Sequence, residues 1–491
     1  MDAPSDTGGA SAPLADTAFA AIEAAIGAAH GADASGFAWL DRSEDALRWR
    51  VALIDSARHS IDLQYYLWHG DDAGKLLIEH VLAAADRGVQ VRILIDDLNT
   101  LLAASGDVPS GDPLVVLIDA HPRIELRLFN PWRKRTLLGR AREMLSRLRR
   151  LNQRMHNKAL IVDDQAAILG GRNLGDNYMG LHDAFNFHDL DVIGIGPVAR
   201  QTRAAFDAYW TSRRAVSVSA LKLAAPAADV QALRRQLQRP SPVLCTLRDL
   251  PLQARSWTAE LQALASRLRI GAARVVWDPP RDGGIEHRMA GHMYDFVGRA
   301  QRELLIVNAY VIPEQRTVDT LATLKARGVD IRLLTNSLAS HDVPAVNSHY
   351  GPWRKRLREA MNGLHEMRHD AAIQGPVVDT PPRRAGFVGL HSKCMVADRQ
   401  RVYVGSMNFD PRSAKTNSEM GVLIDSPALA EDLARLIERD LQPANSWRVE
   451  VDAAGRLSWT HDRTTVGRQP ARNAWQRVLD LVFRLAPREL Y

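Results

Sequence analysis

A motif that occurs twice constrains what this chain can fold into more than any other feature. Residues 156–163 and 391–398 both read His-x-Lys-x4-Asp, lie 235 positions apart, and are followed at matching distances by Gly and Asn. Residues 87–94 likewise recur, 240 positions later, as residues 327–334. A nearly constant offset between unlike segments indicates an internal duplication with small insertions. The chain is therefore predicted to contain two copies of one folding unit.

The order of helices and strands within each copy favours an α/β fold. Residues 76–85 have a helical pattern that ends before Gly88, and the β-branched run at 89–96 is typical of a strand. The second copy repeats this order, with a helix at 317–326 before the strand at 329–334. A glycine after a helix and a β-branched run after the glycine are typical of βαβ units. We expect two tandem α/β/α sandwich lobes with mixed, largely parallel sheets, related by a pseudo-twofold axis and sharing one active site.

Shifts in composition divide the chain into five segments. The first residues are rich in Gly, Ala, Ser and Pro, and the stretch between the two copies lacks strong strand signals. The expected segments are an N-terminal extension with a short helix (1–45), lobe 1 (46–213), a helical connection (214–270), lobe 2 (271–445), and a C-terminal hairpin with an amphipathic helix (446–491).

Composition also restricts the partners and the compartment. The 491 residues carry a formal net charge of +6 and have a pI near 9.4, which favours contact with polyanions such as nucleic acid or anionic lipid headgroups. No apolar run approaches the roughly 20 residues of a membrane-spanning helix, and the start of the chain shows no secretory signal. Cys245 and Cys394 have neither metal-ligand spacing nor a disulfide framework, which is compatible with a reducing compartment.

The residue types in the motif suit attack on a phosphate ester. A histidine can attack phosphorus or transfer a proton, and a lysine two residues later supplies a positive charge on the same side of a strand. If the duplicated fold brings both copies together, one histidine would form a covalent phosphohistidine and the other would act as acid and then as base. The lysines would stabilise the growing negative charge. No metal or other cofactor is expected, because the lysines supply that charge.

Each motif contributes a matching set of candidate site residues. We expect the Asp of each motif, a whole strand away from its histidine, to brace the local backbone, and the later carboxylates to orient the histidines. The predicted catalytic set is His156, Lys158, Asp163, His391, Lys393 and Asp398; the predicted substrate-binding residues are Asn173, Asn408 and Ser406; and the predicted histidine-orienting residues are Asp189 and Glu419.

With these residues in place, both motifs resemble the HKD signature of the phospholipase D superfamily, and the similarity covers about residues 46–445. Segments 61–68, 154–158 and 408–413 further resemble bacterial cardiolipin synthases, especially their C-type branch without N-terminal membrane spans. One departure is Gly171, where the second copy has Ser406, so the first copy lacks one hydroxyl donor.

The resemblance implies a phosphatidyltransferase that makes cardiolipin from phosphatidylglycerol and a second phospholipid through a phosphohistidine. Chain order in related two-copy enzymes favours His156 as the nucleophile. The motif does not separate a transferase from a phospholipase D hydrolase or from a phosphodiesterase acting on nucleic acid, because water and an alcohol enter by the same route. A catalytically silent scaffold that binds anionic surfaces is a third alternative, disfavoured because both His-Lys pairs are intact.

Two helical segments are candidates for membrane contact. Residues 133–154 carry nine Lys or Arg and a single acid, Glu143, so this segment is expected either to lie on an anionic membrane or to pack on the core with a solvated basic face. Core packing is favoured for residues 475–485, because Asp480 interrupts the polar face. The expected partners are phospholipids and an anionic membrane surface without nucleic acid, an accessory protein is left open, and the expected location is cytoplasmic and peripheral at the inner membrane.

Overall fold

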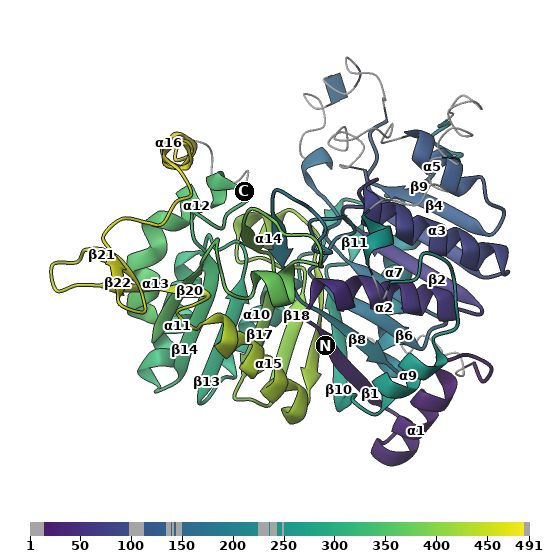
Figure 1. Ribbon diagram of the computed structural model, residues 1–491, viewed down its shortest axis with the longest axis horizontal. Helices are drawn as coiled ribbons and strands as arrows, with labels where there is room; N and C mark the ends of the chain where they lie inside the picture. Colours follow the sequence, from purple (N-terminus) through teal and green to yellow (C-terminus); the bar gives the residue numbers. More distant parts are fainter. Residues whose placement is uncertain are drawn as a thin grey trace.

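Two lobes of similar construction lie side by side in the computed structural model, the N-terminal lobe on the right of Figure 1 and the C-terminal lobe on the left. The structure describes residues 14–97, 112–133, 139, 142–143, 150–223, 235, 243–247 and 250–485. Up to residue 265 the elements are α1 (Ala20–His30), β1 (Ala34–Leu40), α2 (Ser43–Ser56), β2 (Ser60–Tyr65), α3 (Asp72–Asp86), β3 (Gln90–Asp96), α5 (Asp112–Asp119), β4 (Ile124–Phe129), β5 (Ala159–Val162), β6 (Ala166–Gly170), β7 (Asn186–His188), β8 (Asp191–Ile195), α7 (Pro197–Trp210), β9 (Ala215–Ser217), the 3₁₀ turn η1 (Leu244–Thr246) and α9 (Thr258–Ala265).

The second half repeats this order with further elements at its end. They are β10 (Arg269–Trp277), β11 (Pro280–Arg281), β12 (Gly284–Ile285), α10 (Met289–Gly298), β13 (Glu303–Asn308), α11 (Gln315–Ala326), β14 (Asp330–Asn336), α12 (Pro344–Tyr350), η2 (Gly351–Trp353), α13 (Arg354–Ala360), β15 (Gly363–Met367), the π turn η3 (Gln374–Val378), β16 (Val388–Leu390), β17 (Lys393–Ala397), β18 (Arg401–Gly405), α14 (Pro411–Lys415), β19 (Met420–Asp425), α15 (Pro427–Asp440), β20 (Ser446–Val451), β21 (Leu457–His461), β22 (Thr464–Val466) and α16 (Ala474–Phe483).

One continuous sheet of 18 strands runs through both lobes in the part of the chain that the structure describes. The pairs β2–β3, β3–β4, β13–β14 and β14–β15 are parallel, and the other pairs of this sheet are antiparallel. Its order is β9-β4-β3-β2-β5-β6-β8-β1-β10-β19-β18-β17-β13-β14-β15-β20-β21-β22.

The mixed α/β fold with two related lobes is as predicted, but the expectation of largely parallel sheets is wrong. In each lobe three parallel strands come first, as the helix–glycine–strand pattern indicates. The chain then returns beside the first of them as a hairpin, β5–β6 in one lobe and β17–β18 in the other. Strands joined by a hairpin are antiparallel, so the later half of each lobe adds antiparallel pairs.

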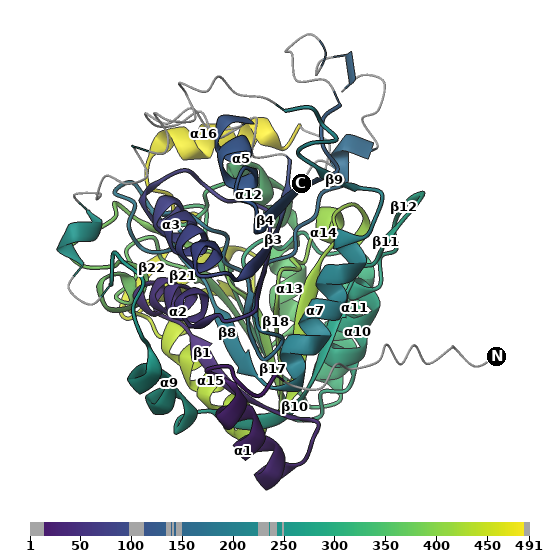
Figure 2. The same ribbon diagram turned by 90° about the vertical axis from the view of Figure 1, so that its right-hand side faces the viewer.

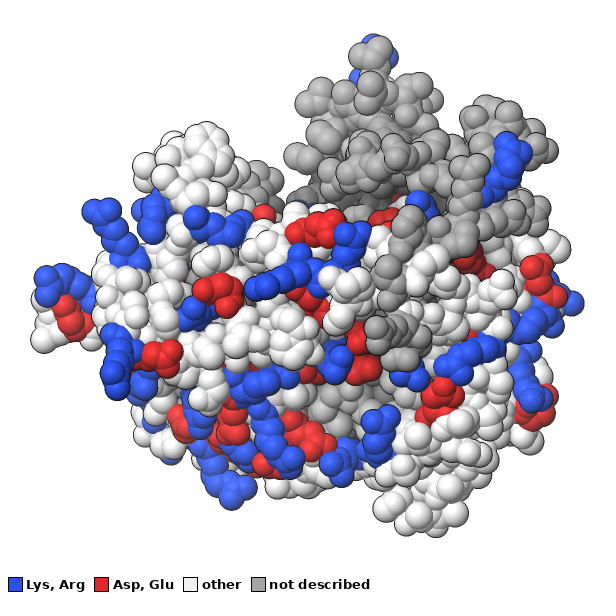
Figure 3. All heavy atoms as spheres, in the orientation of Figure 1, with Lys and Arg blue, Asp and Glu red and all other residues white. Residues whose placement is uncertain are grey.

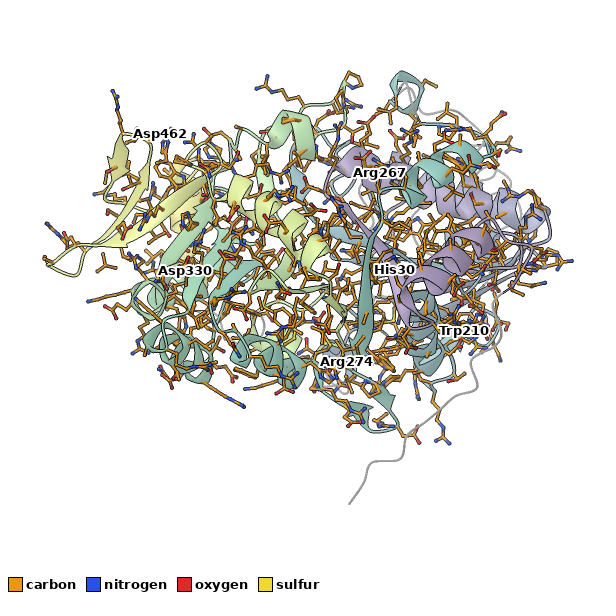
Figure 4. The ribbon with its side chains drawn as sticks, turned by 90° about the horizontal axis from the view of Figure 1, so that it is seen from below. His30, Trp210, Arg267, Arg274, Asp330 and Asp462 are labelled. Atoms are coloured by element: carbon orange, nitrogen blue, oxygen red, sulfur yellow. The ribbon has the colours of Figure 1, made fainter. Side chains whose placement is uncertain are left out.

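The lobes are joined through the two strands at the centre of the sheet. Strand β1 pairs with β8 of its own lobe and with β10, and β10 continues to β19. Seen from below, β10, marked by Arg274, lies between the lobe that carries Trp210 and the lobe that carries Asp330 (Figure 4). Strand β1 belongs to the segment expected to be an N-terminal extension, and it is part of the central sheet. Its sequence alternates too weakly for a strand to stand out.

Helices cover the sheet and define three hydrophobic cores. Helices α2 and α3 pack on the outer face of lobe 1, and α10 and α11 pack on the outer face of lobe 2. Between them, α7 and α15 share a core with strands of both lobes. Helix α15 buries Leu429, Leu433 and Ile437, which recur at the spacing of one helical face. The shared core makes the relative position of the lobes a consequence of burial.

Most of the basic segment 133–154 lies outside the described residues, and the structure tests the other helix. Helix α16 does not pack its apolar face on the core: Gln476 and Asp480 are buried, whereas Trp475 and Leu481 are exposed. Asp480 accepts a hydrogen bond from Asn347 of α12, and Gln476 donates one to the carbonyl of Leu338 in the loop before α12. The helix therefore faces the core with its polar side, the reverse of the expected orientation. No helix among the described residues is long and apolar enough to cross a membrane.

The aspartate of each motif holds a strand end in place. Asp163, which follows β5, accepts hydrogen bonds from the backbone N–H groups of Arg58, His59 and Ser60 at 2.8–2.9 Å. Asp398 likewise accepts from three successive backbone N–H groups, at residues 301–303. Both aspartates lie at the end of their strand remote from the histidine, so they brace the backbone and do not enter the site.

We expect Asp163→Asn to lower the free energy of unfolding by about 1–3 kcal/mol, because an amide has one acceptor oxygen and turns N–H groups toward the donors. Asn tolerates the left-handed backbone of Asp163 (φ 51°), so the change isolates the carboxylate. Asp462→Asn is the matched control, since Asp462 also has a positive φ (46°) and a side chain that is 68% exposed. Urea unfolding measures both, and equal losses would contradict the bracing role.

Candidate active site

Both motif histidines lie at the same edge of the sheet, close to the lobe interface. Strand β5 runs antiparallel to β2, so its beginning lies beside the carboxyl end of β2, and β17 stands in the same relation to β13. His156 and His391 precede these strands and are 8% and 4% exposed. The local hairpin topology thus brings each motif to the carboxyl ends of the parallel strands, where loops converge.

Each histidine binds a carboxylate of the opposite lobe. Nδ1 of His156 lies 2.9 Å from Oε2 of Glu419, and Nδ1 of His391 lies 2.6 Å from Oδ2 of Asp189. All four side chains are buried. An ionised carboxylate at Nδ1 holds that nitrogen protonated, which leaves Nε2 as the nitrogen for chemistry. Each lobe therefore supplies the carboxylate that orients the histidine of the other lobe.

Backbone hydrogen bonds also hold each histidine beside the carboxylate of the opposite lobe. The N–H of His156 donates to the carbonyl of Ser418 at 2.9 Å, and the N–H of Ser418 donates to the carbonyl of Arg154 at 2.8 Å. On the other side, the N–H of His391 donates to the carbonyl of His188 at 2.8 Å. Ser418 and His188 directly precede the two carboxylates. Each histidine is thus aligned with its carboxylate by main-chain contacts as well as by the side-chain bond.

The two motif lysines are buried beside the histidines and over aromatic rings. Nζ of Lys158 donates to the carbonyl of His156 at 2.5 Å and lies 5.3 Å from the ring centre of Tyr66. Lys393 makes the equivalent bond to the carbonyl of His391, and its Nζ lies 5.7 Å from the ring centre of Tyr310. A cation over a ring face is stabilised by the ring quadrupole. Each ammonium group is thereby held next to its imidazole.

Aromatic rings around the histidines are the part of the site that the sequence reasoning missed. Tyr66 lies edge-on to His156 at 5.0 Å between ring centres, and Tyr178 and Phe187 lie 5.3 and 5.0 Å from His391. A signal was available, since Tyr66 and Tyr310 both follow closely on the first parallel strand of their copy. These rings shield the site from water and orient the imidazoles.

Ser406 is committed to a different partner from the one expected. Its single hydroxyl proton is donated to Glu419, so it positions that carboxylate and is not available to a phosphate oxygen. At the matching place in lobe 1, a Cβ on Gly171 would come within 2.3 Å of Oδ1 of Asp189. The glycine therefore makes room for the shorter carboxylate, which replaces the serine contact with the backbone N–H of Leu190 at 2.8 Å.

The two predicted asparagines occupy different settings. Oδ1 of Asn173 accepts from the N–H of Leu67 at 3.2 Å, and its side chain also contacts Tyr178. Asn408 is buried, and its Oδ1 has no hydrogen-bond partner among the residues that the structure describes. Asn173 therefore acts in part on the protein itself, whereas Asn408 keeps a polar atom without a protein partner.

The electrostatic environments of the two histidines differ. Burial, followed by the charges of Lys158 and Lys393, holds the pKa of His156 well below its usual value. Burial and Lys393 also lower the pKa of His391, but Asp189 opposes them through its charge and its hydrogen bond. The imidazole of His156 is therefore the one kept neutral, and that of His391 is the one better able to hold a proton.

The pKa values of the two carboxylates are shifted in opposite directions. Burial raises the pKa of Glu419 to about 7, because Lys158 and Ser406 offset only part of the desolvation. Burial alone would also raise the pKa of Asp189, but His391 and Lys393 outweigh it and hold that pKa below its usual value. Asp189 is thus firmly ionised, and Glu419 titrates near neutral pH.

Burial also weakens the charge of the lysines. It holds the pKa of Lys158 well below its usual value and lowers that of Lys393 to about 8, with Glu419 and Asp189 opposing the shift in each case. An anion entering between the two ammonium groups would restore their charge. The arrangement places two buried ammonium groups beside two imidazoles, a set of groups suited to nucleophilic and acid–base chemistry.

Comparisons with known proteins identify the family of this chain. A family model described as "Cardiolipin synthase, PLD-like domain" matches residues 51–210 and 293–441, one match in each lobe. The chain is 33% identical over 477 residues to cardiolipin synthase C of Escherichia coli, covering 92% of this chain and 94% of that protein. The chain belongs to the cardiolipin synthase-like family of the phospholipase D superfamily. It is an enzyme of that superfamily, as the paired motifs predicted.

More distant relatives support the same family and fold. Cardiolipin synthase B of Escherichia coli is 27% identical, covering 79% of this chain and 77% of its own. The crystal structure of phosphatidylserine synthase from Haemophilus influenzae superposes with a TM-score of 0.56 at 14% identity, over 82% of this chain and 86% of the other. This phospholipase D-like enzyme thus shares its two-lobed fold with a solved structure of low sequence identity.

The pKa values of Glu419 and Lys393 predict a narrow optimum for kcat/KM. Glu419 must be ionised to accept from His156, so the rate should fall as pH decreases through about 7. His391 must also hold a proton, and its pKa is lowered, so the rate should already decline above neutral pH and fall more steeply as pH rises through about 8, where Lys393 loses its charge. Initial rates between pH 5 and 10 measure both limbs.

Glu419→Gln keeps an acceptor for Nδ1 but not the charge, and should remove the acid limb and lower the rate on the order of 10²-fold. Asp278→Asn tests the other buried acid that could set this limb, because burial also raises the pKa of Asp278 to about 7 and its carboxylate accepts from the backbone N–H of Glu419; this variant should keep an acid limb. An acid limb that survives in Glu419→Gln would show that another group sets it.

Proposed function

We propose that this enzyme is a phosphatidyltransferase that makes cardiolipin from phosphatidylglycerol and a second phospholipid. The observation that carries the proposal is the pair of histidines, each bound to a carboxylate of the opposite lobe and flanked by a buried lysine. Extensive similarity to a cardiolipin synthase along nearly the whole chain supports the choice of substrate class.

In the first half-reaction, Nε2 of one imidazole attacks the phosphorus of the donor lipid. A P–N bond forms while the P–O bond to the leaving alcohol breaks, and the second imidazole, protonated, gives its proton to the departing oxygen. In the second half-reaction that imidazole, now neutral, takes the proton of the acceptor hydroxyl. The acceptor oxygen bonds to phosphorus as the P–N bond breaks, which restores both histidines.

We assign the nucleophile to His156 and the acid–base role to His391. The nucleophile must be neutral, and the pKa of His156 is held well below its usual value with no opposing partner among its main contributors. The acid must hold a proton, and Asp189 favours the protonated form of His391. This electrostatic difference agrees with the assignment that chain order favours.

The lysines and Asn408 complete the proposed phosphate site. Lys158 and Lys393 would contact the non-bridging oxygens, whose charge grows as the nucleophile approaches. Oδ1 of Asn408, which has no partner in the described part of the chain, would accept a hydrogen bond from a hydroxyl group of the substrate, since an amide oxygen is an acceptor. The enzyme would act at an anionic membrane surface, on the cytoplasmic side of the inner membrane, because its substrates reside there and its net charge is +6.

The direct test is to incubate the purified protein with mixed micelles of phosphatidylglycerol, with and without phosphatidylethanolamine, and to analyse the lipids by mass. Cardiolipin is the expected main product, and release of ethanolamine would identify phosphatidylethanolamine as donor. His391→Asn is the control and should lose turnover by at least about 10³-fold. Phosphatidic acid as the sole product would contradict the transferase in favour of a hydrolase, and turnover of nucleic acid alone would contradict the lipid substrate.

A further inference from the structure

Helix α16 presents its apolar side to solvent. At 100° per residue its exposed apolar positions fall within roughly 120° of arc, which makes a single stripe along the helix. Within the described part of the chain, the large hydrophobic side chains that are exposed all lie on this helix or two residues beyond its end: Trp475 (65%), Val478 (46%), Leu481 (64%), Val482 (54%) and Leu485 (89%).

Polar contacts hold the helix in this orientation. The carboxylate of Asp480 accepts from the amide of Asn347 at 2.5 Å and from that of Gln469 at 3.0 Å. The side chain of Gln476 donates to the carbonyl of Leu338 at 3.1 Å. Turning the apolar stripe inward would carry Asp480 and Gln476 into water and deprive the buried amide of Asn347 and the buried carbonyl of Leu338 of these partners, which costs free energy. The outward stripe is therefore a built feature of the fold.

The helix is attached to the edge of lobe 2 that carries His391. It packs on α12, and its contacts at residues 338–339 lie in the loop that follows β14. Asn336, at the end of β14, exchanges two hydrogen bonds with the backbone of Leu390, next to His391. Figure 2 shows α16 across the top of the molecule, beside α12.

A second set of contacts joins the same edge to the aromatic rings of the site. The guanidinium of Arg472 lies 3.4 Å from the ring centre of Phe387. Phe387 stacks on Phe185, which lies edge-on to Phe187, and Phe187 contacts His391. The apolar stripe therefore stands on the same side of the molecule as the catalytic residues.

Charge around the stripe is of one sign. Residues 466–485 contain four arginines and one acid, Asp480, which is buried. Arg468, Arg477 and Arg484 are exposed. In Figure 3 the protrusion at the position of α16 is white on the visible side, with blue side chains below it. An exposed apolar stripe that includes a tryptophan and is bordered by cations is typical of a helix lying in a membrane interface.

We propose that α16 inserts its apolar stripe into the headgroup region of an anionic bilayer and so holds the catalytic edge against the membrane. The inference rests on the proposed function insofar as phospholipid substrates place the enzyme at a bilayer. A second copy of the chain fits the stripe less well. A helix of 10 residues is about 15 Å long and about 10 Å wide. The area of its exposed side is therefore far smaller than the roughly 800 Å² that each partner of a stable dimer buries.

The test compares two triple variants of the full chain. Trp475→Ser, Leu481→Ser and Val482→Ser together remove the apolar stripe, whereas Trp475→Phe, Leu481→Met and Val482→Ile together keep it. Binding to vesicles of phosphatidylglycerol and phosphatidylcholine is measured by flotation. The serine variant should need at least about tenfold more lipid for half-maximal binding, and the apolar control should bind like the original chain.

Further readouts separate the causes of a negative result. The changed side chains are exposed, so the thermal midpoint should stay within about 2 °C of the original, and Val478→Ser with Leu485→Ser repeats the test at other positions of the stripe. Unchanged vesicle binding in both serine variants would overturn the proposal. The proposal would also be overturned if sedimentation showed that the original chain is a dimer and that the serine variants are monomers which still bind vesicles. Loss of vesicle binding only in the serine variants would support the membrane-binding proposal. Turnover of dispersed short-chain phosphatidylglycerol tests the proposed function separately. If neither the original chain nor the variants turn over this lipid, the proposed function alone is refuted.

Discussion

The exchange of carboxylates between the lobes is the interaction on which the rest of the site depends. A buried imidazole needs a partner at Nδ1 to keep one tautomer, and here that partner comes from the other half of the chain. The central β1–β10 pair and the core shared by α7 and α15 fix the lobes closely enough to hold both bonds. Neither motif histidine has its carboxylate in its own lobe, which gives the duplicated chain a physical reason to remain a single polypeptide.

Symmetry of construction does not make the two halves equivalent. Ser406 and Glu419 in lobe 2 occupy the positions of Gly171 and Asp189 in lobe 1. Lobe 1 therefore has no hydroxyl at this position and has a carboxylate on a shorter side chain, which changes the local charge balance. Asp189 stays ionised, whereas Glu419 titrates near neutral pH. A reaction that needs a neutral nucleophile and a protonated acid at once requires such a difference between two chemically identical imidazoles.

The sequence predicted the duplication, the two-lobed α/β fold and the motif residues, because each rests on local spacing that recurs. It did not predict the direction of most strand pairs, since a β-branched run indicates a strand but not its neighbour. Asp189 and Glu419 stood out by their distance from Asn173 and Asn408, yet nothing in that spacing tells which histidine each reaches. For α16, periodicity identified an apolar face, but the buried partners of Asp480 that decide its orientation come from distant segments.

The most direct measurement of the central claim, one site served by both lobes with His156 as nucleophile, is to map the covalent intermediate. A phosphatidyl ester of p-nitrophenol needs no acid to leave, so His391→Asn should release one p-nitrophenolate per chain in a burst and then stall. Mass analysis of peptides should place the phosphatidyl group on His156, and His156→Asn should give no burst. A burst from His156→Asn with the label on His391, or two labels per chain in the unchanged enzyme, would contradict the account.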